Sequence, residues 1–407
     1  MITPRPLEPP DLIAGVDTHA DTHTLAVLAA HGGVLLTETF AADKHGYNEL
    51  IKALQNAGSV KLVGVEGTNS YGAGLTRALT TAGYSVKEVL RPTRQVRRMH
   101  GKSDSIDAVE AARSLLAGKG VSQAKDSTTP AESLRFLLTA RAQLITSITA
   151  LGNCITALLT TAPEAVRSKY RGLTTRNLVR RLAASRPGEE THHPHVAVMH
   201  AMQHLAQSHE AASSRAEQLA QQMHSILNTH YPQMLAIYGA GPIVAAQLVV
   251  TAGGNPRRIR DEAAFASLCG VAPIPASSGR TDRHRLNRGG DRRGNSALHR
   301  IAFIRMRSDE RTREYARRRT AEGKSKREIM RCLKRAIARE VYRALTSQPA
   351  ATSQHHDLKT LREAKRLTQA QVARALGTYP ARISDIERHR RPLPELATRY
   401  KQWLEAA

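Results

Sequence analysis

Apolar positions over the first 120 residues alternate between short runs and helix-like spacing. The runs with strand character are 12–17, 24–30, 34–40, 61–66 and 84–90. The Gly32-Gly33 pair between the second and third runs is typical of a hairpin turn. Helical spacing appears in 43–57, around Leu75 and Leu79, and again after residue 104. The resulting order, β-β-β-α-β-α-β-α, predicts an α/β domain in which helices cover a mixed sheet.

Two long helices are predicted farther along the chain, at about 130–161 and 196–230. In the first, leucines recur every seven residues, at 137, 144, 151 and 158, which is typical of a coiled coil. A helical hairpin within one chain and a coiled coil between chains both satisfy this pattern. The segment 163–194 is basic and contains proline, so we expect a linker or an RNA-facing excursion. Its three histidines have no partner acids or cysteines nearby and are interpreted as linker residues rather than metal ligands, namely His192, His193 and His195.

A Gly-rich turn at 239–241 opens the next helix and resembles the hairpin of helix-hairpin-helix DNA binders, although a plain helix-entry turn fits equally well. Farther on, Ser277 and Ser278 precede Gly279 in a loop that contains proline and glycine. A serine hydroxyl is a poor nucleophile until a base or metal activates it, and arginines neutralise a phosphate under attack. From these residues alone the loop is ordinary. The first arginines after it, which we expect to contact DNA, are Arg280, Arg283 and Arg285.

The last fifty residues contain the start and stop signals of the helices in a helix-turn-helix. Thr368 is a helix cap, Gly377 ends that helix, and Pro380 begins a second one. In repressor-type domains of this kind the second helix enters the major groove through its first residues. Contact with another protein is the alternative use of such a domain. The predicted DNA-facing positions are Gln369, Ala381, Arg382 and Ser384.

The net positive charge of the chain predicts a polyanionic binding partner. The 407 residues include 60 Lys and Arg against 35 Asp and Glu, a formal net charge of +25, and nucleic acid is the first candidate for such a chain. We find no stretch of about 18 apolar residues and no signal peptide. Aromatic residues make up only 4%, which argues against binding by base stacking. The three cysteines form no CxxC pair, so we expect reduced thiols in a cytoplasmic protein.

Four acids stand where they can converge. Asp17 and Glu66 each end an apolar run, and ligands gather at the carboxyl ends of strands. Asp104 and Asp107 are three residues apart at the start of a helix, so they share one face and repel unless a cation lies between them. A helix cap with an acid in its first turn is the alternative interpretation of this pair. Together the four carboxylates would form an oxygen cage suited to Mg²⁺.

The segments Gly15-Val16-Asp17-Thr18-His19, Gly64-Val65-Glu66-Gly67-Thr68 and 102–108 resemble the DEDD signature of bridge-RNA-guided insertion-sequence transposases. Pro273 to Gly279 and the basic stretch after it resemble the second domain of that family. The resemblance spans about 12–345 and implies a RuvC-like domain of the ribonuclease H fold. The implied domains are a RuvC-like DEDD domain (11–120), a coiled-coil region (121–235), a mainly helical serine-bearing domain (236–346), a linker (347–356) and a helix-turn-helix (357–407).

The resemblance also implies a mechanism. The four acids hold Mg²⁺, and a serine joins covalently to a DNA phosphate, with Ser278 the first choice and Ser277 the close alternative. A structured non-coding RNA reads donor and target DNA. The chain assembles into a homo-oligomer through its coiled coil, combining the acids of one protomer with the serine of another, at the nucleoid in the cytoplasm. Arg91, Arg94, Arg97 and Arg98, just before the Asp pair, are expected to contact the nucleic-acid backbone.

Two other functions remain open. One is a metal-dependent nuclease that resolves four-way junctions, in which water attacks and the serines are structural. The other is a non-catalytic regulator that binds DNA through the helix-turn-helix.

Overall fold

The computed structural model describes residues 12–90, 103–276, 284–285, 287, 289–347, 358–387 and 393–406. These fall into two compact units, Met1–Ser133 with Ala252–Arg260, and Leu134–Thr251 with Asp261–Ala407. Several predicted features lie outside the described residues: the arginines of 91–102, Ser277, Ser278, Arg280, Arg283 and all of the linker except Ser347.

The first unit is built on a six-stranded mixed sheet with the order β3-β2-β1-β4-β5-β6. Its strands are β1 (Leu12–Thr18), β2 (Thr22–Leu28), β3 (Val34–Ala41), β4 (Val60–Glu66), β5 (Ser85–Val89) and β6 (Val121–Gln123). The β1 strand runs antiparallel to β2 and parallel to β4, which in turn runs parallel to β5. The predicted mixed sheet and the order of its first eight elements are confirmed. The β6 strand was not predicted, because its three residues include only one apolar side chain.

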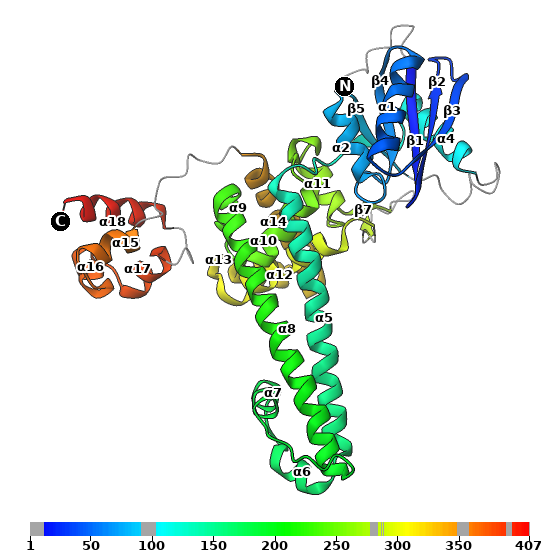
Figure 1. Cartoon of the computed structure of the whole chain (residues 1–407). Helices are drawn as coiled ribbons and strands as arrows, with labels where there is room; N and C mark the ends of the chain where they lie inside the picture. The colour runs from blue at the N-terminus through cyan, green and yellow to red at the C-terminus, as the bar shows by residue number, and fades with distance from the viewer. Residues whose placement is uncertain are drawn as a thin grey trace. The chain divides into compact units, whose positions relative to one another are not determined.

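Helices cover both faces of this sheet (Figure 1). They are α1 (Lys44–Ala57), α2 (Ala73–Thr81) and α4 (Asp104–Ala117). Alternation along β1 assigns each side chain to a face: Ala14 and Val16 pack with α1 and α2, while Ile13 packs with α4. The odd-numbered residues of β1 therefore face α4.

A segment from late in the chain completes the first unit. Asn255 donates from Nδ2 to Ala124 O over 2.9 Å, and its Oδ1 accepts from Asp126 N over 3.0 Å. The short helix η1 (Pro256–Arg258) follows. The stretch 252–260 thus packs within the first unit, although it lies within the predicted serine-bearing domain.

A helical hairpin dominates the start of the second unit. In Figure 1, α5 (Pro130–Thr161) and α8 (Pro194–His230) lie side by side, as in the single-chain alternative. The segment between them is not a linker, because it folds into α6 (Glu164–Tyr170) and α7 (Thr175–Ala183). These short helices bury apolar side chains against the hairpin. In the sequence, the many surface arginines made this apolar pattern hard to see. The buried residues include Val166, Tyr170, Leu178, Val179, Leu182 and Met202.

The leucine repeat of α5 is only partly covered. Between Leu138 and Ile155 the helix, described throughout, has no buried residue, and Ile145 is 40% exposed. Association with a second chain along this face stays a prediction. Among the described residues, α5 is the one helix long and apolar enough to cross a membrane, with a mean hydropathy of 1.5 over an 18-residue window, so the sequence prediction of no such stretch was wrong. A single helix of this kind does not identify a membrane protein, because long helices of soluble proteins meet the same criteria.

Six further α-helices follow α8 among the described residues up to Ser347. They are α9 (Pro232–Leu235), α10 (Pro242–Ala252), α11 (Glu262–Leu268), α12 (Arg292–Ser308), α13 (Glu310–Ala321) and α14 (Lys326–Thr346). One face of α14 packs inward, through the buried side chains of Ile329, Leu333, Ile337 and Val341. Two short strands, β7 (Ile274–Pro275) and β8 (His284–Arg285), pair antiparallel.

The C-terminal helices have a core of their own. They are α15 (Leu358–Ala364), α16 (Gln369–Ala375), α17 (Pro380–Glu387) and α18 (Pro394–Ala406). Thr368 caps α16 in a capping box with Gln371, and Gly377 follows with a positive φ of 63°, so the predicted helix-turn-helix boundaries are confirmed. Val372, Ile383 and Tyr400 are fully buried in this core.

Candidate active site

Asp17 and Glu66 lie beside each other at one edge of the sheet. The β1 and β4 strands run parallel with Val16 opposite Val65, so the next residue of each strand carries its carboxylate at the same level. Both acids are buried, with exposures of 3% and 4%. Thr18 Oγ1 donates to Glu66 O over 2.7 Å and ties the two strand ends together. By the alternation along β1, Asp17 points to the face that α4 covers.

A pair of glycines lets α4 approach that face closely. Gly15 and Gly64 are register partners. A Cβ atom on Gly15 would lie 2.3 Å from both Ala108 O and Ala112 N, and one on Gly64 would lie 2.9 Å from Leu115 Cδ1. The helix backbone therefore rests directly on β1. This contact brings the first turn of α4 to the sheet edge that carries Asp17.

Asp104 and Asp107 occupy that first turn. The N-cap is Ser103, whose Oγ accepts from Ile106 N over 3.3 Å, so Asp104 does not cap the helix and that alternative was wrong. The Asp104 side chain is 50% exposed, whereas Asp107 is only 7% exposed. The structure thus brings all four predicted acids to one end of the first unit.

Electrostatic coupling among these acids appears in the pKa of Asp17. Burial raises the pKa of the Asp17 carboxyl, His19 opposes the rise, and the charges of Asp107 and Asp104 add to it. Negative charge that is both buried and mutually repulsive favours a bound cation.

His19 was not predicted as a site residue, yet it lies between two of the acids. Its Nε2 is 3.1 Å from Asp17 Oδ2 and 3.2 Å from Asp104 Oδ1. The three groups form one of the described clusters whose ligand atoms lie within 4.8 Å of one another. In a sequence, a histidine close to Asp21 and His23 after a strand is ordinarily a turn residue. The signal available was its position two residues after a strand-end acid.

The serines lie outside the described residues, but most residues on either side of their loop are described. We call these flanking residues, within 269–276 and 284–295, the neck of the loop. Ile274 in β7 pairs with Arg285 in β8, and a Cβ on Gly270 would lie 2.5 Å from Gly289 O. Asn295 Nδ2 donates to Cys269 O over 2.9 Å and to Gly270 O over 3.1 Å.

Two further side chains brace this neck. Lys334 Nζ donates to Asn295 Oδ1 over 2.9 Å, and Thr251 Oγ1 donates to Asp291 Oδ2 over 2.6 Å. Burial, with help from Arg331, lowers the pKa of Lys334. Helices α10, α12 and α14 thereby hold together both ends of the segment that carries Ser277 and Ser278. Of the three arginines after the serines that were predicted to contact DNA, Arg285 alone lies within the described residues, and its side chain is exposed.

The predicted DNA-facing residues of the C-terminal domain differ in accessibility. Ala381 and Arg382 are exposed at the start of α17, and Ser384 is half-buried. Gln369 instead donates from Nε2 to Glu387 Oε2 over 2.7 Å, so its amide is engaged within the domain.

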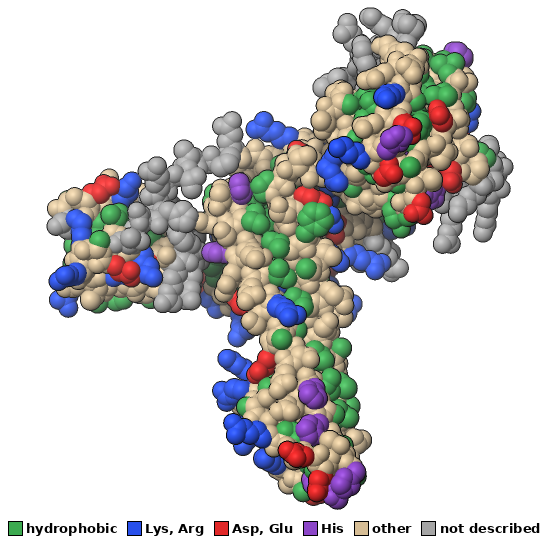
Figure 2. All heavy atoms as spheres, viewed as in Figure 1, with side chains coloured by type: hydrophobic (Ala, Val, Ile, Leu, Met, Phe, Trp, Pro, Cys, Tyr) green, Lys and Arg blue, Asp and Glu red, His purple; other side chains and the backbone are tan. Residues whose placement is uncertain are grey.

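Exposed arginines also gather on the helical hairpin. Figure 2 shows Lys and Arg side chains over α7, at the far end of α5 and α8. The exposed arginines of this stretch are Arg171, Arg176, Arg180, Arg181 and Arg186. The surface is suited to backbone phosphates, which attract arginine regardless of sequence.

Comparison with known families agrees with this arrangement. A transposase model of the IS110 group, named for its DEDD residues, matches residues 14–163 and so includes all four acids. A second model, described as the transposase IS116/IS110/IS902 family, matches 232–317 and includes both serines. A helix-turn-helix model matches 356–400, which indicates DNA binding by that domain. No curated protein matches the chain. The two transposase matches together span more than half of the 407 residues, and the chain belongs to the IS116/IS110/IS902 family of insertion-sequence transposases.

Proposed function

We propose that this transposase cuts and rejoins DNA at a divalent-metal site formed by Asp17, Glu66, Asp104 and Asp107. The observation that carries the proposal is the convergence of these acids over the Gly15–Gly64 pair, with three of the four almost fully buried. Four carboxylates in that setting cost free energy unless a cation neutralises them. The family implies a divalent metal, and the donor set fits one.

The chemistry of the donors favours Mg²⁺. Carboxylate oxygens are the ligands that hard cations prefer, and Mg²⁺ commonly keeps several waters beside one or two carboxylates. When bound, such a metal supplies Lewis-acid polarisation of a phosphate and neutralises developing negative charge. His19 is placed to orient the Asp17 and Asp104 carboxylates.

The nucleophile in this proposal is the hydroxyl of Ser278, with Ser277 the alternative. Its oxygen forms a bond to the scissile phosphorus, and the bond from phosphorus to the leaving deoxyribose oxygen breaks. The serine proton passes to a base or water, and the leaving oxygen takes up a proton to become a free hydroxyl. Reversal by a new deoxyribose hydroxyl frees the serine and joins the strands. The braced neck at Asn295 and the exposed Arg285 suit a loop that must present a serine to a phosphate.

Recognition is divided among the basic surfaces. The helix-turn-helix binds DNA, and Arg382 at the start of α17 is placed for a groove or backbone contact. A structured guide RNA is the proposed reader of donor and target, and the arginines over α7 are a candidate surface for its backbone. Association of chains along α5 would combine the acids of one protomer with the serine of another. We expect the chain to act at the nucleoid in the cytoplasm.

The test is a cleavage assay with labelled donor and target DNA, Mg²⁺ and the RNA that co-purifies with the protein. The wild type should give a covalent protein–DNA adduct that survives denaturation. A variant with Ser277→Ala and Ser278→Ala should give neither adduct nor rejoined product. If that variant still cuts DNA, a junction-resolving nuclease that uses water fits better. Sequencing of the bound nucleic acid tests guidance separately, and a preparation without a defined RNA would contradict it.

A further inference from the structure

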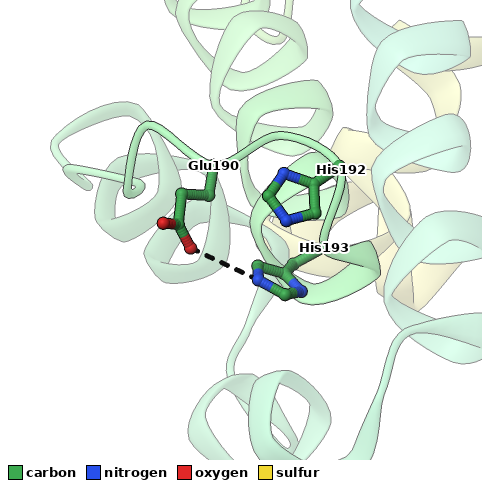
Figure 3. Close-up of side chains that lie close together, drawn as sticks. All are labelled: Glu190, His192 and His193. Atoms are coloured by element: carbon green, nitrogen blue, oxygen red, sulfur yellow. Dashed lines mark ion pairs between the residues drawn. The ribbon is translucent and has the colours of Figure 1, made fainter.

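The turn between α7 and α8 brings together three side chains that the proposed transposition chemistry does not use. Figure 3 shows the Glu190 carboxylate facing the His193 ring, with the His192 ring beside it. One ligand atom from each residue lies within 4.8 Å of the other two. The sequence interpretation that these histidines have no acidic partner was therefore wrong.

The spacing matches a small tetrahedral metal. His193 Nε2 and Glu190 Oε2 are 3.3 Å apart. Ligand atoms about 2.0–2.1 Å from a tetrahedral zinc ion are themselves roughly 3.3 Å apart. Two imidazoles and one carboxylate, with a water in the fourth position, form a familiar donor set for this metal. Two nitrogen donors also favour Zn²⁺, Co²⁺ or Ni²⁺ over Mg²⁺.

The backbone of the turn holds these residues in place. His193 N donates to Glu190 O over 3.1 Å, which folds 190–193 into a single turn and puts both side chains on one side. Pro194 opens α8 and restricts His193 to extended geometry, observed at φ −80° and ψ 126°.

The chain leading into the turn is fixed to α8 as well. His200 Nε2 lies 2.8 Å from Gly188 O, and Gln207 Nε2 donates to Ala183 O over 3.4 Å. Gln203 Nε2 also donates to Ser185 O. A ligand set on a turn braced in this way loses little conformational entropy when a metal binds.

We propose that Glu190, His192 and His193 bind a divalent transition metal, with Zn²⁺ the best fit, at the tip of the helical hairpin. Two of its three donors are imidazoles, so it selects a softer metal than the acid cluster, where carboxylates outnumber the single imidazole of His19. A bound ion would join the end of the α7–α8 connection to His193, the N-cap residue of α8. It would thereby stiffen the hairpin tip that presents the arginines of α7.

The test uses the full-length chain, freed of metal and then kept in excess Mg²⁺ so that the acid cluster is filled. Zn²⁺ is titrated by calorimetry, and Co²⁺ is added separately to read its absorption. Wild-type protein should bind one Zn²⁺ per chain, and Co²⁺ should show the intense visible bands of a tetrahedral site. Zn²⁺ should also slow amide exchange in 188–193.

The variants His192→Ala, His193→Ala and Glu190→Gln replace exposed side chains and leave the fold intact. Each should weaken Zn²⁺ binding by about 10- to 100-fold or more and remove the exchange protection. The matched control is His45→Ala, since His45 and Glu49 form a His–Glu pair at the same 3.3 Å with no third ligand found among the described residues. That variant should bind as the wild type does. Unchanged Zn²⁺ binding after both His192→Ala and His193→Ala, or no saturable binding by the wild type, would overturn the proposal.

Discussion

At the scale of single residues, Gly15 decides whether the acids meet. Any side chain there would displace the backbone of α4, since a Cβ would lie 2.3 Å from Ala108 O. Backbone atoms cannot rotate away as a flexible side chain can, so the whole helix would have to shift. The position of Asp104 and Asp107 relative to Asp17 therefore depends on the absence of a side chain at Gly15.

Gly15→Ala should destabilise the first unit by about 1–3 kcal/mol, the usual cost of overpacking. It should also reduce metal-dependent cleavage, because the acids would separate. Gly241→Ala is the matched control, since its Cβ would meet nothing within 4 Å. Chemical denaturation followed by circular dichroism checks both variants. Equal midpoints for the two would show that α4 does not rest on β1 as described.

His23 gives the first unit a pH dependence. Its ring is fully buried and stacks on Tyr47 with centroids 5.6 Å apart. Burial, with a smaller effect of His19 in the same direction, lowers its pKa, although the backbone of Thr22 opposes the shift. The unfolded chain then binds a proton that the folded chain excludes. The contribution of the neutral, buried His23 ring to the stability of the first unit is complete above the pKa of a histidine in the unfolded chain, about 6.5. It is lost as the pH falls below that value.

We expect the unfolding midpoint of the first unit to drop between about pH 7 and pH 5.5, and His23→Phe to flatten that drop. Thermal unfolding at several pH values measures it. Replacement of the exposed His31 by Gln should leave the drop unchanged. A His23→Phe protein with the full wild-type pH dependence would contradict this assignment.

At the scale of elements, the helix-turn-helix is held by one buried ion pair. Arg362 Nε donates to Glu387 Oε1 over 2.6 Å, and Tyr400 OH donates to the same oxygen over 2.8 Å. With Gln369 also donating to Glu387, all four helices of the domain meet at this carboxylate. Burial alone would raise the pKa of Glu387, but hydrogen bonds from Arg362, Gln369 and Tyr400 outweigh it and lower the pKa.

Glu387→Gln should destabilise this domain by roughly 3 kcal/mol, because it leaves the Arg362 charge buried without its partner. Trp403, the single tryptophan of the chain, packs against the core of this domain and reports its unfolding in the full-length protein. Glu363→Gln is the control, since that acid is 3.3 Å from Arg362 but 54% exposed. Equal fluorescence midpoints for the two variants would show that the network does not hold the domain.

The lowered pKa of Glu387 also determines how the stability of the helix-turn-helix changes with pH. Its contribution is complete above the unfolded pKa of a glutamate, about 4.3, and is lost as pH falls through the lower folded value. The tryptophan transition of the wild type should therefore weaken in acid, whereas that of Glu387→Gln should weaken less.

Across the whole molecule, the parts that sequence predicts best are those with strict spacing. The strand-end positions of Asp17 and Glu66 and the three-residue spacing of Asp104 and Asp107, taken together with the DEDD resemblance, predicted the acid cluster. His19 was missed because a histidine in a turn has several ordinary explanations. The helices α6 and α7 were missed because basic residues are interspersed among the few apolar positions that pack. The contact of Asn255 with Ala124 has no sequence signal, since it joins segments more than a hundred residues apart.

Positive and negative charges are expected to have different roles in this chain. The chain carries a net +25, whereas the acid cluster concentrates negative charge at one sheet edge. Affinity for nucleic acid should come from lysine and arginine and fall with salt, while cleavage should depend on the acids. Binding and chemistry are therefore separable by mutation.

The most direct test of this account is Asp107→Asn, measured for cleavage and for binding in the same preparation. The exposed Asp21, on the turn after β1, provides the control Asp21→Asn. We predict that Asp107→Asn lowers Mg²⁺-dependent strand cleavage by roughly 100-fold or more, as expected when one preorganised charge is lost. DNA affinity and its salt dependence should match the wild type, and Asp21→Asn should cut normally. Cleavage by Asp107→Asn at the wild-type rate would contradict the claim that these four acids form the active site.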